Sequence, residues 1–414
     1  MGVTRYYNFT VSRGSQSPDG VSKTMLLVNG QFPGPLIEAQ WGDTIEGRVH
    51  NAIDNPKEAE EYGTSWCHAH YSGQYMDGAF GPMIFHGSPA NLKIRQIIFT
   101  PNNNLINGKI PFDCSISHDT ICVNDASRSV FKLINAGNSG IQKFSIDNHD
   151  LLVVTNDFFP VKPYKTKVVT LGVGQRSDVL VTAGGMPTDA VWMRSELNIE
   201  CLNVTSIQLN ATAAVYYPKA NTNSFHRLEE LHDPLSQTIP LYPKTPGRPD
   251  ITMSISLTVG LNGTGNVVFY VNNSSFYGKY ERSFSAQPES NVINLGSATS
   301  VRLMGFGEWD GVITNPLNPQ RRDSQQLGPG TTDEPAFIVI QWETDNPGIW
   351  PFHCHISTHA SAGLYVNILQ QPNLVTDKQI PEIVRETCDP WNSYAKSNDV
   401  HQFDSGLKFC TDVK

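Results

Sequence analysis

The chain has 414 residues and carries little charge, most of it negative. Charged residues make up 17% of it, with 30 Lys and Arg against 39 Asp and Glu, a formal net charge of −9. It has no block of basic residues, which argues against nucleic acid as a partner. No apolar run reaches the roughly 20 residues that a membrane-spanning helix needs, so we also expect no membrane partner.

A secretory signal is absent from the first residues, Met1 to Tyr7, although other features suggest secretion. Six Asn-x-Ser/Thr sequons are present, and six on a turn-rich chain favour a secreted glycoprotein. We therefore expect an extracellular protein whose signal peptide is missing from this version of the chain. The sequons lie at Asn8, Asn203, Asn210, Asn262, Asn272 and Asn273.

Cysteine is scarce, with seven in the chain, and one of them, Cys354, stands among histidines. The other six are compatible with disulfides in an oxidising compartment and equally with reduced thiols, because pairing cannot be read from sequence. They are Cys67, Cys114, Cys122, Cys201, Cys388 and Cys410.

Glycine and proline are plentiful, at 33 and 27 residues, which favours a turn-rich β protein of two to four domains. Strand patterns at Tyr6–Val11 and Lys23–Val28 precede Asn29-Gly30, a strong hairpin-turn signal. Two further strands are predicted at 168–171 and 178–181.

The stretch Trp350–His359 holds three histidines and a cysteine within seven positions. It follows an apolar run, Ala336–Trp342, that predicts a buried strand, and a turn at Asp345–Gly348. The apolar Ile349 and Trp350 predict that the next strand begins there.

If that strand extends through His355, His353 and His355 share one face about 7 Å apart, and Cys354 points the other way. Two histidines on one face suit two neighbouring metal ions. A cysteine with a nearby histidine is a copper-type ligand set, and His359 is placed to join Cys354 there. The alternatives are a structural zinc site and a buried, redox-inert cysteine.

His68 and His70 show the same i, i+2 spacing within Gly63–His70, so both can face one metal pair. An exposed histidine pair on a strand is the alternative reading. The second histidine pair near Cys354 makes metal ligands the better interpretation.

Three segments resemble multicopper oxidases, and fungal laccases in particular. DNPGIWPFHCHISTHASAGL (345–364) resembles the last copper motif, GTSWCHAHYSGQYMDGAFGPMIFHG (63–87) the second, and VNGQFPGPLIEAQWGDTIEGRVHN (28–51) the start of the first domain. The resemblance implies an all-β fold of three cupredoxin-like Greek-key β-sandwich domains. We expect them at 1–88, 89–245 and 246–375, followed by a tail at 376–414.

The resemblance also implies copper as cofactor, a small phenolic reductant and dioxygen as substrates, and a monomer. In this family a mononuclear copper takes electrons from the reductant, and a three-copper cluster between the first and third domains reduces dioxygen to water. Cys354 and His359 match mononuclear-site ligands, and Leu364 matches the axial position. His68 with His355, and His70 with His353, match the two coupled ions, so Cys354, His353 and His355 match the catalytic link.

Two family motifs are missing from this chain. His-Trp-His-Gly does not follow His50, and Gly296–Phe306 stands where His-Pro-x-His-Leu-His-Gly-His is expected. We therefore expect incomplete first and third domains and a laccase-like oxidase of impaired activity. The alternative is a catalytically inactive copper-binding protein, and a zinc hydrolase is a distant third. His50, His86, His118 and His149 receive no role.

Overall fold

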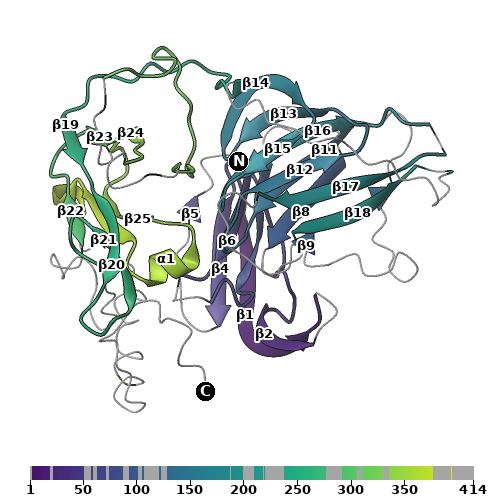
Figure 1. Ribbon diagram of the computed structural model, residues 1–414, viewed down its shortest axis with the longest axis horizontal. Helices are drawn as coiled ribbons and strands as arrows, with labels where there is room; N and C mark the ends of the chain where they lie inside the picture. Colours follow the sequence, from purple (N-terminus) through teal and green to yellow (C-terminus); the bar gives the residue numbers. More distant parts are fainter. Residues whose placement is uncertain are drawn as a thin grey trace. The chain divides into compact units, whose positions relative to one another are not determined.

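The computed structural model is nearly all β, as the sequence predicts (Figure 1). Its helices with described bounds are α1 (Ser357–Ser361) and the 3-10 turn η4 (Pro372–Leu374). No helix among the described residues is long and apolar enough to cross a membrane. The structure describes residues 2–18, 22–50, 57–58, 63–70, 74–86, 93–100, 105–106, 121–122, 128–186, 188–198, 209–217, 219, 237–276, 291–304, 309, 311–328, 330, 335–375 and 393.

The chain divides into two compact units. Unit 1 comprises Met1–Lys244 and Leu317–Gln326, and unit 2 comprises Thr245–Pro316 and Leu327–Lys414. The division at Lys244 falls in the proline-rich stretch from Pro234 to Pro249.

Unit 1 begins with two small sheets. The first has, in spatial order, β2 (Lys23–Val28), β1 (Thr4–Gln16), β4 (Thr44–His50) and β5 (Lys57–Glu58). The second has β3 (Ile37–Gln40), β7 (Phe80–His86) and β6 (Gly63–His68).

Two larger sheets complete unit 1 and enclose its main core, where Phe131, Leu133 and Phe144 are fully buried. One sheet has β14 (Phe159–Thr166), β13 (Leu151–Asn156), β16 (Arg176–Thr182), β11 (Arg128–Asn135), β8 (Lys93–Thr100) and β9 (Leu105–Ile106). The other has β10 (Ile121–Cys122), β18 (Asn210–Tyr216), β17 (Ala190–Leu197), β12 (Gln142–Ile146) and β15 (Val169–Leu171).

Unit 2 packs its sheets around a smaller core that includes Val301, Leu303, Val366 and Ile368. Its strands are β19 (Ile251–Ser254), β23 (Ser300–Met304) and β24 (Val339–Glu343) in one sheet; β20 (Leu257–Leu261) and β21 (Val267–Val271) in a hairpin; and β22 (Val292–Asn294), β26 (Tyr365–Gln370) and β25 (Gly348–His353) in a third sheet.

One pattern of strand pairing occurs three times along the chain. A first strand pairs in parallel with a later one in β1–β4, β8–β11 and β19–β23. A trio of strands also occurs three times, with one parallel and one antiparallel pair in each. The trios are β3-β7-β6, β10-β18-β17 and β22-β26-β25. Three repeats of one β-sandwich plan account for this recurrence.

The repeats differ at one place, and the difference concerns the strands that carry histidines. In the middle repeat, β12 to β15 lie between β11 and β16, and β12 covers the outer edge of β17. In the first repeat β4 is followed by β5 after residues 51–56, and in the third β23 is followed by β24 after residues 305–338. Within the described residues, β6 and β25 are therefore edge strands of their sheets, whereas β17 has a neighbouring strand on both sides.

These two intervals bear on the missing motifs. The first interval directly follows His50, after which the first motif is expected. In the third repeat, Ser300–Met304 forms β23, which pairs with β19 as β11 pairs with β8. The absence of the two motifs stays a prediction from the sequence.

Individual strand predictions mostly hold. Lys23–Val28 is a strand with the predicted bounds, and both Asn29 and Gly30 have positive φ, as a tight hairpin turn requires. The prediction of a buried strand at Ala336–Trp342 is wrong in part: β24 begins only at Val339, and its side chains are half-buried or exposed. The reason is that β24 is an edge strand of its sheet.

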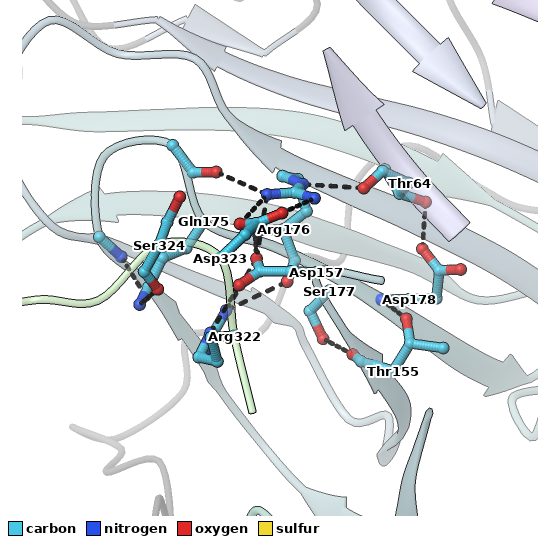
Figure 2. Close-up of polar contacts among 12 residues, drawn as sticks. Thr64, Thr155, Asp157, Gln175, Arg176, Ser177, Asp178, Arg322, Asp323 and Ser324 are labelled. Carbon is cyan, nitrogen blue, oxygen red and sulfur yellow. Dashed lines mark hydrogen bonds and ion pairs between the residues drawn. The ribbon is translucent and has the colours of Figure 1, made fainter. Parts of the chain in front are cut away.

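A cluster of charged side chains around buried Asp157 and Arg176 holds the segment Leu317–Gln326 against the middle repeat within unit 1 (Figure 2). Arg322 donates to both carboxylate oxygens of Asp157, and Arg176 donates to both oxygens of Asp323. Burial alone would raise the pKa of Asp157, but Arg176 and Arg322 hold it below its usual range.

Candidate metal centre

His68 and His70 lie side by side at the end of β6. Their rings stack with centroids 4.4 Å apart, and the His68 ring also stacks on Trp66 at 4.3 Å. The Nδ1 atom of His68 lies 3.2 Å from the carbonyl oxygen of Ala69. A backbone contact at Nδ1 leaves Nε2 as the metal-binding nitrogen, which is a common arrangement in metal sites.

β6 is held in place by the middle repeat of unit 1. The guanidinium of Arg176 donates through Nε to the carbonyl oxygen of Thr64, at 2.8 Å. The hydroxyl of Thr64 donates to Asp178 (Figure 2). The carboxylate of Asp178 also accepts from Lys132 Nζ at 2.8 Å. The strand that ends in His68 thus begins at a buried polar anchor.

Cys67 lies between these anchors and the histidines. Its Sγ contacts the carbonyl oxygen of Gly81 at 3.4 Å. Burial raises the pKa of this thiol, so it remains protonated at neutral pH in the absence of a bound metal ion.

Cys354 and His359 meet in unit 2, with Cys354 Sγ 3.6 Å from His359 Nδ1. Cys354 follows the end of β25, and His359 is on α1. Two backbone bonds fix this geometry: Cys354 N donates to the carbonyl of Leu364 at 3.1 Å, and Leu364 N donates to the carbonyl of His359 at 3.0 Å. The three residues predicted for a mononuclear site are therefore tied to one another by the backbone.

The segment formed by α1 and the turn at Gly363, which carries His359, is packed closely against β21. Gly363 has φ +105°, and a Cβ at this position would clash with Ser275 Oγ. Phe269 N donates to the carbonyl of Ala362 at 2.8 Å, and the Phe269 ring lies 4.5 Å from the ring of His359. Glycine is required here because the backbone approaches its neighbours without room for a side chain.

His353 and His355 lie beside each other, with ring centroids 5.5 Å apart. The strand was expected to extend through His355, but β25 ends at His353. His353 stacks on Tyr365 at 5.3 Å, and its Nδ1 lies 2.9 Å from the carbonyl oxygen of Cys354. As at His68, this contact leaves Nε2 for a metal.

Burial shapes the protonation of the candidate ligands. It raises the pKa of the Cys354 thiol and lowers the pKa of both His353 and His359. Neutral imidazoles offer a lone pair to a metal ion, and a bound ion deprotonates a coordinating thiol outright. The donor types, the Cys354–His359 separation and the backbone contacts at Nδ1 all fit copper.

Complete ligand sets are not present within the part of the chain that the structure describes. No group of three or more His, Cys, Asp or Glu side chains there is arranged to hold a metal ion. The six predicted ligands occur as local pairs, His68 with His70, His353 with His355, and Cys354 with His359.

The histidines that received no role have other environments. His50 is exposed, His86 lies 3.1 Å from a carboxylate oxygen of Glu38, and buried His149 lies 2.7 Å from the Tyr217 hydroxyl. His118 lies outside the described residues. Sequence reasoning did not find the anchor at Thr64 and Arg176, because no local pattern joins residues 112 positions apart.

Family models described as multicopper oxidase match residues 10–59, 68–220 and 269–373, which together span most of the chain. Oxidoreductase OpS5 of Beauveria bassiana is 28% identical, with 98% of this chain and 88% of the relative covered. Laccase-2 of Botryotinia fuckeliana is 26% identical, with 98% and 89% covered. The first of these alignments has 532 positions against 414 residues here, so over a hundred positions face a gap in this chain.

Solved structures agree on the fold. The laccase from Botrytis aclada matches with a TM-score of 0.82 at 24% identity, covering 98% of this chain and 95% of that one. Fet3p, a multicopper oxidase that functions in iron import, matches with a TM-score of 0.76 at 19% identity, covering 94% and 95%. This chain belongs to the multicopper oxidase family, whose members bind copper, and it has the cupredoxin-like fold of laccases.

Proposed function

We propose that this protein is a laccase-like oxidoreductase that couples one-electron oxidation of small phenols or diphenols to reduction of dioxygen to water, with impaired activity. The observation that carries the proposal is the contact between Cys354 and His359, with His353 and His355 directly on either side of Cys354. Similarity to laccases and to dihydrogeodin oxidase of Aspergillus terreus, 25% identical, supports a phenolic substrate.

Each ligand residue has a distinct part in this proposal. Copper, when bound, supplies one-electron redox chemistry. Cys354 and His359 would hold the copper ion that takes electrons from the reductant, and Leu364 has no donor atom to offer. One peptide unit joins Cys354 to each of its neighbours His353 and His355, so the proposed ligands on the two sides are linked by a short covalent path. His353 with His355 in unit 2, and His68 with His70 in unit 1, are the two pairs that would bind copper on the dioxygen side.

A second candidate is a copper-binding protein of the same fold without catalytic turnover. Two observations favour it. Within the described residues the candidate ligands occur only as pairs, and the alignment with the Beauveria relative leaves over a hundred of its 532 positions without a residue among the 414 of this chain. Four-electron reduction of dioxygen demands more ligands than these pairs supply.

Oxygen uptake decides between the two candidates. The copper-loaded chain is mixed with a diphenol in an oxygen electrode, and the variant C354S is the matched control. Uptake above the buffer rate that C354S abolishes supports the oxidase. A wild-type rate equal to the buffer control, with copper bound, leaves the binding protein as the function.

We also propose that the protein is a secreted glycoprotein acting on small phenols of secondary metabolism. Five of its six sequons fall on described residues, and Asn8, Asn210, Asn272 and Asn273 are exposed. Expression through a secretory pathway followed by glycosidase treatment tests this. A decrease in mass supports it, and an unchanged mass argues against it.

A further inference from the structure

We propose that the copper site at Cys354 and His359 keeps one coordination position that a small exogenous nitrogen donor, such as free imidazole, occupies directly. The inference rests on the proposed function in one respect, that copper binds the Cys354 thiolate. It goes further in assigning to this site a ligand that the chain does not supply.

The first argument is an inventory of donors. Copper–thiolate sites of the electron-transfer type use one cysteine and two histidines in a trigonal set. Residues 245–316 and 327–414 contain only four histidines: His353, His355, His359 and His401. Only His359 is in contact with the Cys354 sulfur among the described residues, and His401 lies outside them.

The neighbouring histidines are committed elsewhere. The His353 ring stacks on Tyr365 at 5.3 Å and lies beside the His355 ring at 5.5 Å. The Nδ1 atom of His353 also lies 2.9 Å from the carbonyl oxygen of Cys354. Among the described residues, the Cys354 sulfur contacts His359 and neither of these two rings.

The strand that leads to Cys354 has an open edge within the described residues. In the middle repeat, β12 pairs along the outer edge of β17. β25 has the same place in its trio of strands as β17, and within the described residues its outer edge has no partner strand.

The site is also reachable and firmly built. Cys354, His359 and Leu364 are each partly exposed, so a molecule as small as imidazole has access. Leu364 carries no donor atom to compete for the ion. Gly363 packs closely on Ser275 and Phe269, which restricts the segment that carries His359 beside Cys354.

Spectroscopy of the metal-loaded chain tests the inference without reference to turnover. One equivalent of Cu(II) is added to the metal-free protein at neutral pH, and the thiolate-to-copper charge-transfer band is recorded while imidazole is titrated. Electron paramagnetic resonance with ¹⁴N- and ¹⁵N-imidazole then reports direct bonding through the nitrogen hyperfine coupling. Co(II), which the thiol does not reduce, serves as a second metal probe.

We expect a saturable shift of the band on adding imidazole and a hyperfine pattern that changes with the isotope. The H359A variant should need imidazole to give the band at all, and C354S should give none. A band that forms in the wild type but ignores imidazole overturns this inference and leaves the proposed function intact. Copper binding with no charge-transfer band in the wild type overturns the proposed role of Cys354 itself.

The H401A variant is the control for His401, the histidine within 327–414 that lies outside the described residues. If His401 supplies the missing imidazole, the wild type will be insensitive to imidazole and H401A will respond to it, which overturns the inference. An identical response in the two proteins supports it.

Discussion

Arg176 and Asp323 form a two-point ion pair, with both guanidinium NH2 groups donating to the carboxylate at 2.5 and 2.7 Å across 147 chain positions (Figure 2). The same guanidinium donates through Nε to the carbonyl of Thr64, at the start of the strand that ends in His68. Arg176 is 3% exposed. One buried side chain thus holds both the Leu317–Gln326 segment and the histidine-bearing strand of unit 1.

Replacing Arg176 with Met should destabilise unit 1 strongly. The change leaves Asp157 with one cation fewer in a buried setting, and breaking a buried pair in this way costs about 3–5 kcal/mol. Lys at this position restores the charge but not the fork that serves Asp323 and Thr64, so R176K should be intermediate. Hydrogen exchange of peptides covering 63–70 and 317–326 measures the effect.

A matched control is the exposed pair between Lys167 and Asp150, 2.6 Å apart with both side chains about half exposed. K167A should change the stability by less than about 1 kcal/mol, because water screens exposed pairs. Equal exchange in wild type and R176M at both peptides would show that the Arg176 contacts do not hold these segments.

Two contacts, one between residues close in the sequence and one between residues far apart, show what the sequence can and cannot predict. Cys354 and His359 are five positions apart, so strand and turn patterns suffice to predict their meeting, and the structure places them 3.6 Å apart. The contact of Arg176 with Asp323 has no local signal at all. Long-range polar contacts depend on how strands pair, which residue patterns do not specify.

The sequence also did not predict the degree of burial of one strand correctly. The apolar run 336–342 predicts a strand, and the structure has one, but its side chains are not fully buried. An apolar pattern indicates a preference for burial, whereas actual burial needs a neighbouring layer. β24 is at the edge of its sheet, so part of its surface has no such layer among the described residues.

Asp43 should make the amino-terminal strand sensitive to acid. Its carboxylate accepts from the backbone N–H groups of Val3 and Gln40, each at 2.9 Å, and from the Arg5 side chain. These bonds lower its pKa to about 2. Because the folded pKa lies below the unfolded value near 3.9, the stabilisation is complete above about pH 4 and is lost as the pH falls toward 2.

The variant D43N tests the direction of this pH dependence of stability. Its thermal midpoint should lie below that of the wild type at pH 7, and the difference should shrink between pH 4 and 2. E46Q, which removes the exposed carboxylate that lies 3.3 Å from Arg48, is the control and should show no such convergence. A difference between D43N and wild type that is constant from pH 7 to 2 would contradict the assignment.

Gly363 should be intolerant of a side chain. G363A places a Cβ against Ser275 Oγ and within 2.8 Å of the Phe269 carbonyl, so the loop carrying His359 must shift. Gly265, with φ +83° and open space around its Cβ position, is the matched control in the same unit. Backbone strain alone costs about 1–3 kcal/mol at either site, so the excess loss in G363A measures the crowding.

A spectroscopic result should accompany that loss. If the loop moves, His359 leaves Cys354, and the thiolate-to-copper band of G363A should weaken while that of G265A stays as in the wild type. A G363A protein with a normal band would mean that the site does not depend on this close packing.

Copper stoichiometry follows from the ligand pairs. Two imidazoles hold Cu(II) more weakly than a larger set of nitrogen ligands would, because Cu(II) strongly prefers nitrogen and each additional imidazole adds a donor. We therefore expect zero to two tightly held copper ions per chain by elemental analysis after dialysis against a weak chelator. Replacing His68 and His70 together should not affect the charge-transfer band, because that band reports the site of Cys354 and His359. Near four ions per chain would mean that residues outside the described ranges complete the sites, and full oxidase turnover would then be expected.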